Sequence, residues 1–133
     1  MFRLDASAKS EVGRVSKAAE KTAFRNLGHA ANRIMKDARA SIVTNQNAPS
    51  AAGSPPHTKA QAGHNLRTAI RYDSNKEDAV VGPMASMVGE AGATHEFGQE
   101  RGGVDYPERP FMGPALERNL DRFADSWRGA ITE

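Results

Sequence analysis

The chain has 133 residues, of which 38% are hydrophobic and 26% are charged, with a formal net charge of +2 and no cysteine. This length predicts one domain with one core, and the lack of cysteine excludes disulfides, thiol catalysis and thiolate metal sites. So small a net charge does not by itself indicate nucleic-acid binding. No apolar run reaches the roughly 18 residues of a membrane span, and no signal peptide is recognised, so we expect no membrane association.

The first third of the chain predicts one long amphipathic helix, from about residue 9 to residue 42. Its apolar side chains recur at steps of three or four, the spacing of a single helix face: Val12, Val15, Ala19, Ala23, Leu27, Ala30, Ile34, Ala38 and Ile42. Asp5 and Ser7 are candidate caps. At 1.5 Å per residue the helix is about 50 Å long, more than a small domain covers. We therefore expect it either to break, at Gly13 or Gly28, or to contact another subunit.

A basic stripe lies on the opposite face of this helix, within a sector about 100° wide. Its members are Arg14, Lys17, Lys21, Arg25, Lys36 and Arg39. The simplest interpretation is a solvated helix face. The alternative is a surface for an acidic neighbouring subunit or for DNA in a channel, where binding would be directed to phosphates and weakened by salt.

Residues 44–64 are polar and rich in Gly, Pro and Ala, and predict a long flexible loop. Loops of this length inside compact domains are either functional or disordered. A contact with a neighbouring protomer and simple disorder both stay open here.

A β-hairpin is predicted next, followed by a short or irregular helix. Apolar and polar residues alternate from Leu66 to Tyr72 as in a half-buried strand, 73–78 have turn composition, and 79–81 form a second short strand. Helical spacing returns between residues 84 and 95, interrupted by glycines. Residues 104–106 predict a further strand.

The last helix is predicted from Pro114 to about Ile131. Its apolar face comprises Leu116, Leu120, Phe123, Trp127 and Ile131. Such a face usually packs in a core, and a partner-binding role for its outer edge is the alternative. The sequence thus predicts an α+β fold: a long N-terminal helix and a small antiparallel sheet of three or four strands covered by a C-terminal amphipathic helix.

A structural joint is predicted between the Glu96-Phe97-Gly98 turn and the Arg109-Pro110-Phe111 segment before this helix. Pro110 favours an extended Arg109, and a proline such as Pro114 suits the first helical turn. Phe111 is then held just ahead of the helix as an anchor, and Glu96 and Arg109 are expected to form an ion pair across the joint. The candidate joint or interface residues are Glu96, Phe97, Gly98, Arg109, Pro110, Phe111 and Pro114.

These two motifs, in this order, resemble the small tail-component family of tailed bacteriophages, the head-to-tail connector or tail-completion proteins. Three further pieces upstream are similar to the same family: Gly53-Ser54-Pro55-Pro56-His57, the segment from Ala62 to Ile70, and Val81-Gly82-Pro83. Together the resemblance covers roughly residues 50 to 131.

The resemblance implies a structural virion protein, assembled in the cytoplasm of the host bacterium, within the neck ring that joins capsid to tail. The implied partners are copies of the chain itself, as a six-fold ring, connector or adaptor proteins, and tail-tube or tail-terminator proteins, with non-specific DNA contact in the channel. The whole chain is then one domain, with 1–43 the long helix, 44–64 the loop and 65–133 the sheet and last helix. The alternative function is a nucleic-acid-binding module that uses the basic stripe.

No catalytic, cofactor or metal site is predicted. The four histidines include one close pair, His57 and His64, within the flexible loop, where no rigid frame holds further ligands. No nucleophile elbow or phosphate-binding loop occurs. We therefore expect no enzymatic activity, and a small metal-dependent nuclease is the least favoured interpretation.

Overall fold

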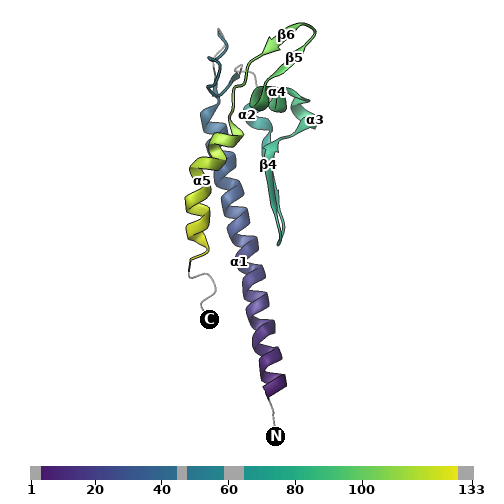
Figure 1. The fold of residues 1–133 in the computed structure, drawn as a ribbon, viewed down its shortest axis with the longest axis vertical. Helices are drawn as coiled ribbons and strands as arrows, with labels where there is room; N and C mark the ends of the chain where they lie inside the picture. The colour runs from purple at the N-terminus through teal and green to yellow at the C-terminus, as the bar shows by residue number, and fades with distance from the viewer. Residues whose placement is uncertain (1–3, 45–47, 59–64, 129–133) are drawn as a thin grey trace.

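The computed structural model describes residues 4–44, 48–58 and 65–128 and is elongated, with one helix running along most of its length (Figure 1). That helix is α1 (Leu4–Ser41), and the other elements gather beside its C-terminal part. They are, in order, β1 (Val43–Thr44), β2 (His57–Thr58), α2 (Leu66–Ala69), β3 (Ile70–Ser74), β4 (Ala79–Pro83), α3 (Ala85–Val88), α4 (Ala91–Phe97), β5 (Gln99–Arg101), β6 (Val104–Tyr106) and α5 (Met112–Ser126).

Helix α1 is continuous, so of the two alternatives expected for it the break at Gly13 or Gly28 does not occur, and the contact with another subunit stays a prediction. Asp5 and Ser7 lie inside the helix, and their predicted role as caps is wrong too. Gly28 lies beside the hairpin, where a Cβ would make an ordinary contact of 3.6 Å with Ser74 Oγ. Every side chain from Gly13 to Ala18 is exposed, and this part of α1 extends beyond the other elements (Figure 1).

The core lies at the C-terminal end of α1, where three segments meet. Ile34 and Ala38 contribute from α1 and Ile42 from the residue just after it. Leu66 and Ile70 contribute from α2 and β3, and Phe111 and Ala115 from the N-cap and first turn of α5. Ile70, Phe111 and Ala115 have no exposed surface. The predicted α+β class, with a long first helix, small antiparallel sheets and a C-terminal helix packed against them, is confirmed.

The strands form three separate pairs, where the sequence predicted one sheet of three or four strands. β3 and β4 form the predicted hairpin, with Ile70 opposite Pro83 and Ser74 opposite Ala79. β6 pairs with β5, because Gly102 and Gly103 have φ angles of 58° and 78° and form a tight two-residue turn. β1 and β2 make a short parallel pair.

The predicted first strand of the hairpin starts four residues later than expected, because residues 66–69 form the single helical turn α2. Asn65 Oδ1 accepts a hydrogen bond from the Thr68 amide at 3.0 Å, and Thr68 Oγ1 accepts one from the Asn65 amide at 3.3 Å. This reciprocal capping box stabilises a helical start. Leu66 and Ala69 are both buried by the turn.

Part of the predicted loop 44–64 is held against the segment before α5. The Gly53 amide donates to the Glu108 carbonyl at 2.8 Å, and Arg109 Nε donates to the Ser50 carbonyl at 2.9 Å. Pro56 and Thr58 are buried. Residues 45–47 and 59–64 lie outside the described residues, so the flexibility predicted for the whole loop stays a prediction.

Helix α5 runs antiparallel to α1 but uses a different face from the predicted one. Its buried residues are Ala115 and Asn119, and Asn119 Nδ2 donates to Asp37 Oδ2 of α1 at 2.7 Å. Leu116 and Leu120 are 47% and 49% exposed. The small Ala115 packs in the same cluster as the small Ala38 of α1, so the helices come close and the leucines are left at the edge of the contact.

The start of α5 also differs from the prediction. The helix begins at Met112, so Pro114 is its third residue, where a missing N–H still costs no intrahelical hydrogen bond. Of the predicted apolar face, Phe123 and Trp127 are half-buried and pack edge to face, with ring centroids 6.2 Å apart. Ile131 lies outside the described residues.

Truncating Phe111 tests this core. Because its ring is fully buried and Phe97 is 74% exposed, Phe111→Ala is expected to lower the free energy of unfolding by about 3–5 kcal/mol and Phe97→Ala by less than about 0.5 kcal/mol. Urea unfolding followed by circular dichroism measures both variants. Equal losses in the two would contradict the packing described.

Candidate assembly joint and apolar groove

Glu96 caps the N-terminus of α5 from the last turn of α4. Its Oε2 accepts hydrogen bonds from the amides of Phe111 and Met112, both at 2.9 Å, and its Oε1 accepts one from Gly113 at 2.8 Å. First-turn amides have no acceptor within their own helix, and a carboxylate is favoured at the positive end of the helix dipole. A single side chain therefore satisfies three amides and ties α4 to α5.

The predicted ion pair between Glu96 and Arg109 is wrong for the residues that the structure describes. The Arg109 side chain donates from Nε to the Ser50 carbonyl, and its amide donates to the His95 carbonyl at 2.6 Å. The Glu96 carboxylate is engaged by backbone amides instead. Arg109 still belongs to the joint, because it connects α4 and the 48–58 segment to the chain just before α5.

Two glycines permit the close contacts of this joint. A Cβ on Gly113 would lie 3.0 Å from Glu96 Oε1. Gly98 ends α4 with φ of 71°, and a Cβ there would lie 3.0 Å from the Tyr106 carbonyl oxygen. A side chain at Gly113 would crowd the Glu96 carboxylate, and one at Gly98 would crowd the chain between β6 and α5 at Tyr106 and Glu108.

The predicted joint residues mostly meet in one place. Glu96, Gly98, Arg109 and Phe111 make the contacts just described, and Pro110 links the last two. Pro114 lies in the first turn of α5. Phe97 is the exception, because its side chain is 74% exposed.

The role of Glu96 as a distant cap was missed in the sequence. The available signal was the lack of a local cap, since Phe111 occupies the N-cap position and makes no side-chain hydrogen bond to the helix. Serine, threonine, aspartate and asparagine usually satisfy these amides.

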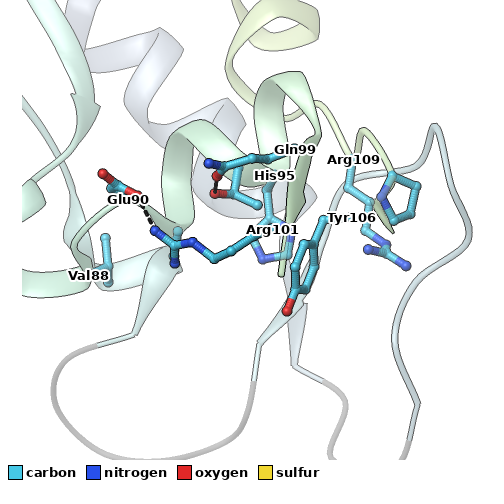
Figure 2. Close-up of a pocket in the computed structure, with 10 residues that line it drawn as sticks. Val88, Glu90, His95, Gln99, Arg101, Tyr106 and Arg109 are labelled. Carbon is cyan, nitrogen blue, oxygen red and sulfur yellow. Dashed lines mark hydrogen bonds and ion pairs between the residues drawn. The ribbon is translucent and has the colours of Figure 1, made fainter. Parts of the chain in front are cut away.

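A small pocket of about 370 Å³ lies beside the joint, between α4 and the β5–β6 hairpin (Figure 2). Several of its polar groups are already paired with one another: Arg101 with Glu90, and Thr94 Oγ1 with Gln99 Oε1 at 3.0 Å. Burial, and then the neighbouring Arg109, lower the pKa of His95. We assign no chemistry to this pocket.

No metal centre is found among the described residues, because no three potential ligands converge there. His57 Nδ1 lies 3.1 Å from the Ala48 carbonyl oxygen, and His64 is outside the described part of the chain. Within the same part, no helix is long and apolar enough to cross a membrane.

A second feature is an apolar groove of about 440 Å³ between α5 and β4, with α1 as its floor, which we term the α5 groove. Leu27 and Ile34 lie on the floor, Val80 and Val81 on the β4 side, and Leu116 and Leu120 on the α5 side. Val80 is 69% exposed. The groove exists because α5 contacts α1 through Ala115 and Asn119, which leaves its leucines facing β4 across open space.

The basic stripe is exposed along most of its length. Arg14, Lys17, Lys21, Arg25 and Lys36 are exposed, and Arg39 is half-buried. Arg39 donates from Nε and Nη2 to the Ile70 carbonyl, at 3.1 and 2.5 Å. Its predicted place on a solvated face is therefore only partly right, since it also joins α1 to β3.

No protein-family model, curated protein or solved structure matches this chain.

Removing the distant cap should destabilise the chain. Glu96→Ala leaves three first-turn amides without their acceptor and is expected to lower the free energy of unfolding by about 2–3 kcal/mol, and Glu96→Gln, which keeps one oxygen, by less. Glu117→Ala, at an exposed position of α5, is the matched control and should change it by less than about 0.5 kcal/mol. A loss no larger than that of the control would show that Glu96 does not cap α5.

The lowered pKa of His95 predicts a specific pH dependence. Below the unfolded-state pKa of about 6.5 the unfolded chain binds a proton that the folded chain does not, so stability falls as the pH drops through this window. His95→Gln removes this contribution. Urea titrations at pH 7.5 and 5.5 should show a smaller loss in the variant than in the parent chain, and equal losses would contradict the assignment.

Proposed function

We propose that the chain is a structural subunit of the neck or tail-completion ring that joins the capsid of a tailed phage or prophage to its tail. The sequence resemblance supports this assignment. The observation that carries it is that the described residues leave two unlike surfaces uncovered, the apolar α5 groove and the mixed polar and apolar projecting part of α1. A ring requires such heterologous contacts, repeated by rotation.

The projecting part of α1 is the first of these surfaces. Val15 is 52% exposed there. Phe24, also 52% exposed, lies further along α1 and lines a shallow pocket together with Ser74 and Lys76 of the hairpin. The groove is the second, with Val80, Leu116 and Leu120 all about half exposed or more. Contiguous exposed apolar side chains mark interaction surfaces, because burying them in a contact gains a free energy of about 25 cal/mol per Å² of apolar surface.

The motifs that carry the resemblance surround the joint that positions α5. Glu96 and Phe111 fix the start of this helix, and the outward side of the same helix lines the groove. A motif that holds α5 in place thus also sets the shape of the surface offered to a partner. The proposed partners are other copies of the chain, connector or adaptor proteins, and tail-tube or tail-terminator proteins, and no reaction is part of the proposal.

A nucleic-acid-binding module is the alternative function, favoured by the exposure of five of the six residues of the basic stripe. The two functions differ in where the protein is found. A neck subunit is recovered with phage particles, whereas a nucleic-acid-binding module is recovered with host nucleic acid.

Reconstitution tests the proposal. Purified chain, added to capsids and tails from a lysate that lacks it, should produce joined particles visible by electron microscopy. Leu116→Asp with Leu120→Asp should reduce joining at least about tenfold, because each charge would be desolvated in the groove contact. Ala124→Asp, at an exposed position of the same helix, should not. A parent chain that joins no particles and associates with neither capsids nor tails would contradict the proposal.

A further inference from the structure

Three arginines from adjoining elements lie near the C-terminal end of α1, and we term them the guanidinium cluster: Arg39, Arg67 and Arg71. Arg39 of α1 is bonded to the Ile70 carbonyl, Arg71 follows Ile70 in β3, and Arg67 lies one helical turn before it in α2. Helix α2 contacts α1 directly (Figure 1). Only Arg39 belongs to the stripe predicted from the sequence.

The orientation of Arg39 is fixed in advance of any ligand. A guanidinium carries five N–H groups in a rigid plane. Two nitrogens of Arg39 donate to the single Ile70 carbonyl oxygen, and its other N–H groups have no acceptor among the described residues. A guanidinium held in this way loses little conformational entropy when it binds an anion.

The cluster is electrostatically unbalanced within the described residues. None of its three arginines has a carboxylate within 4.0 Å, although Arg101, Arg118 and Arg128 elsewhere each do. Burial lowers the pKa of Arg39, and the positive charges of Arg71 and Arg67 lower it further. Mutual repulsion of this kind is relieved by an anion.

The positive surface continues along α1 from the cluster. Lys36 lies one turn from Arg39, and Arg25 and Lys21 lie on the same side of the helix, all three exposed. From Lys21 to Arg39 the helix rises about 27 Å, which matches about eight base pairs of a duplex.

We propose that the guanidinium cluster binds backbone phosphates of a nucleic acid, and that Lys36, Arg25 and Lys21 extend this contact along α1. Planar guanidinium groups match phosphate oxygens bidentately. A row of cations along a straight helix suits a ligand whose negative charges repeat at regular intervals, as in a duplex, better than a local carboxylate group. The contact reads no base sequence. It goes beyond the assembly role and deepens the alternative function, because it adds Arg67 of α2 and Arg71 of β3 to the contact surface.

The test is binding of a short labelled duplex DNA to the full chain, followed by fluorescence anisotropy. Affinity should fall more than about tenfold between about 50 and about 200 mM salt. Arg67→Ala and Arg71→Ala should each weaken binding about three- to tenfold at low salt and reduce the salt slope by about one. Arg122→Ala removes the same charge at an exposed site on α5, and should change neither the affinity at low salt nor the salt slope.

Thermal unfolding of each variant separates lost binding from lost folding. Lys36→Ala serves as a second probe, because this exposed residue lies outside the contact between Arg39 and β3 and should also weaken binding.

Four results would overturn the proposal. The first is no binding of the duplex at low salt, and the second is a loss of affinity in Arg122→Ala equal to that in Arg67→Ala and Arg71→Ala. The third is displacement of the duplex by inorganic phosphate better than by sulfate at equal ionic strength. The fourth is tighter binding of poly-glutamate than of the duplex. The third result would indicate a site for free phosphate, and the fourth an acidic protein partner.

Discussion

The hydrogen bonds from three α5 amides to Glu96 are the interaction on which the rest of the structure depends. They connect the small elements around α4 to the last helix. With the start of α5 held there, Phe111 and Ala115 enter the core and Asn119 reaches Asp37 of α1. The same constraint leaves Leu116 and Leu120 facing β4. One capping interaction thus determines both how the core closes and which apolar surface stays open.

The proposed assembly role follows from how little of α1 the rest of the chain covers. The core occupies its C-terminal part, where Ile34, Ala38 and Ile42 are buried, whereas every side chain from Gly13 to Ala18 is exposed. A helix of this length is stabilised mainly by packing. Among the described residues, no other element packs against its projecting part. The guanidinium cluster lies near the C-terminal end of α1, away from the projecting residues 13–18.

Periodic and turn signals predicted most of the fold, because they depend on residues close in sequence. The long helix, the hairpin around residues 73–78 and the joint before α5 were all found. The predictions that failed concern contacts between residues far apart in the sequence, which no short motif indicates. Glu96 binds backbone amides, which nearly all residues have and which the sequence therefore does not single out. An ion pair with Arg109 was predicted instead, because opposite charges can be recognised in a sequence. In α5, the residues that contact α1 are Ala115 and Asn119, and not the larger leucines. A pattern of large apolar residues does not predict a helix contact made by an alanine and an asparagine. The single turn α2 alternates like a strand, and only its capping box distinguishes it.

Amide hydrogen exchange at the start of α5 tests the central claim most directly. First-turn amides of a helix normally exchange fast, since no carbonyl of the helix accepts them. We expect the amides of Phe111, Met112 and Gly113 to be protected in the parent chain and to lose protection in Glu96→Ala under conditions where the core amides of α1 stay protected. Equal exchange at these three amides in both proteins would contradict it.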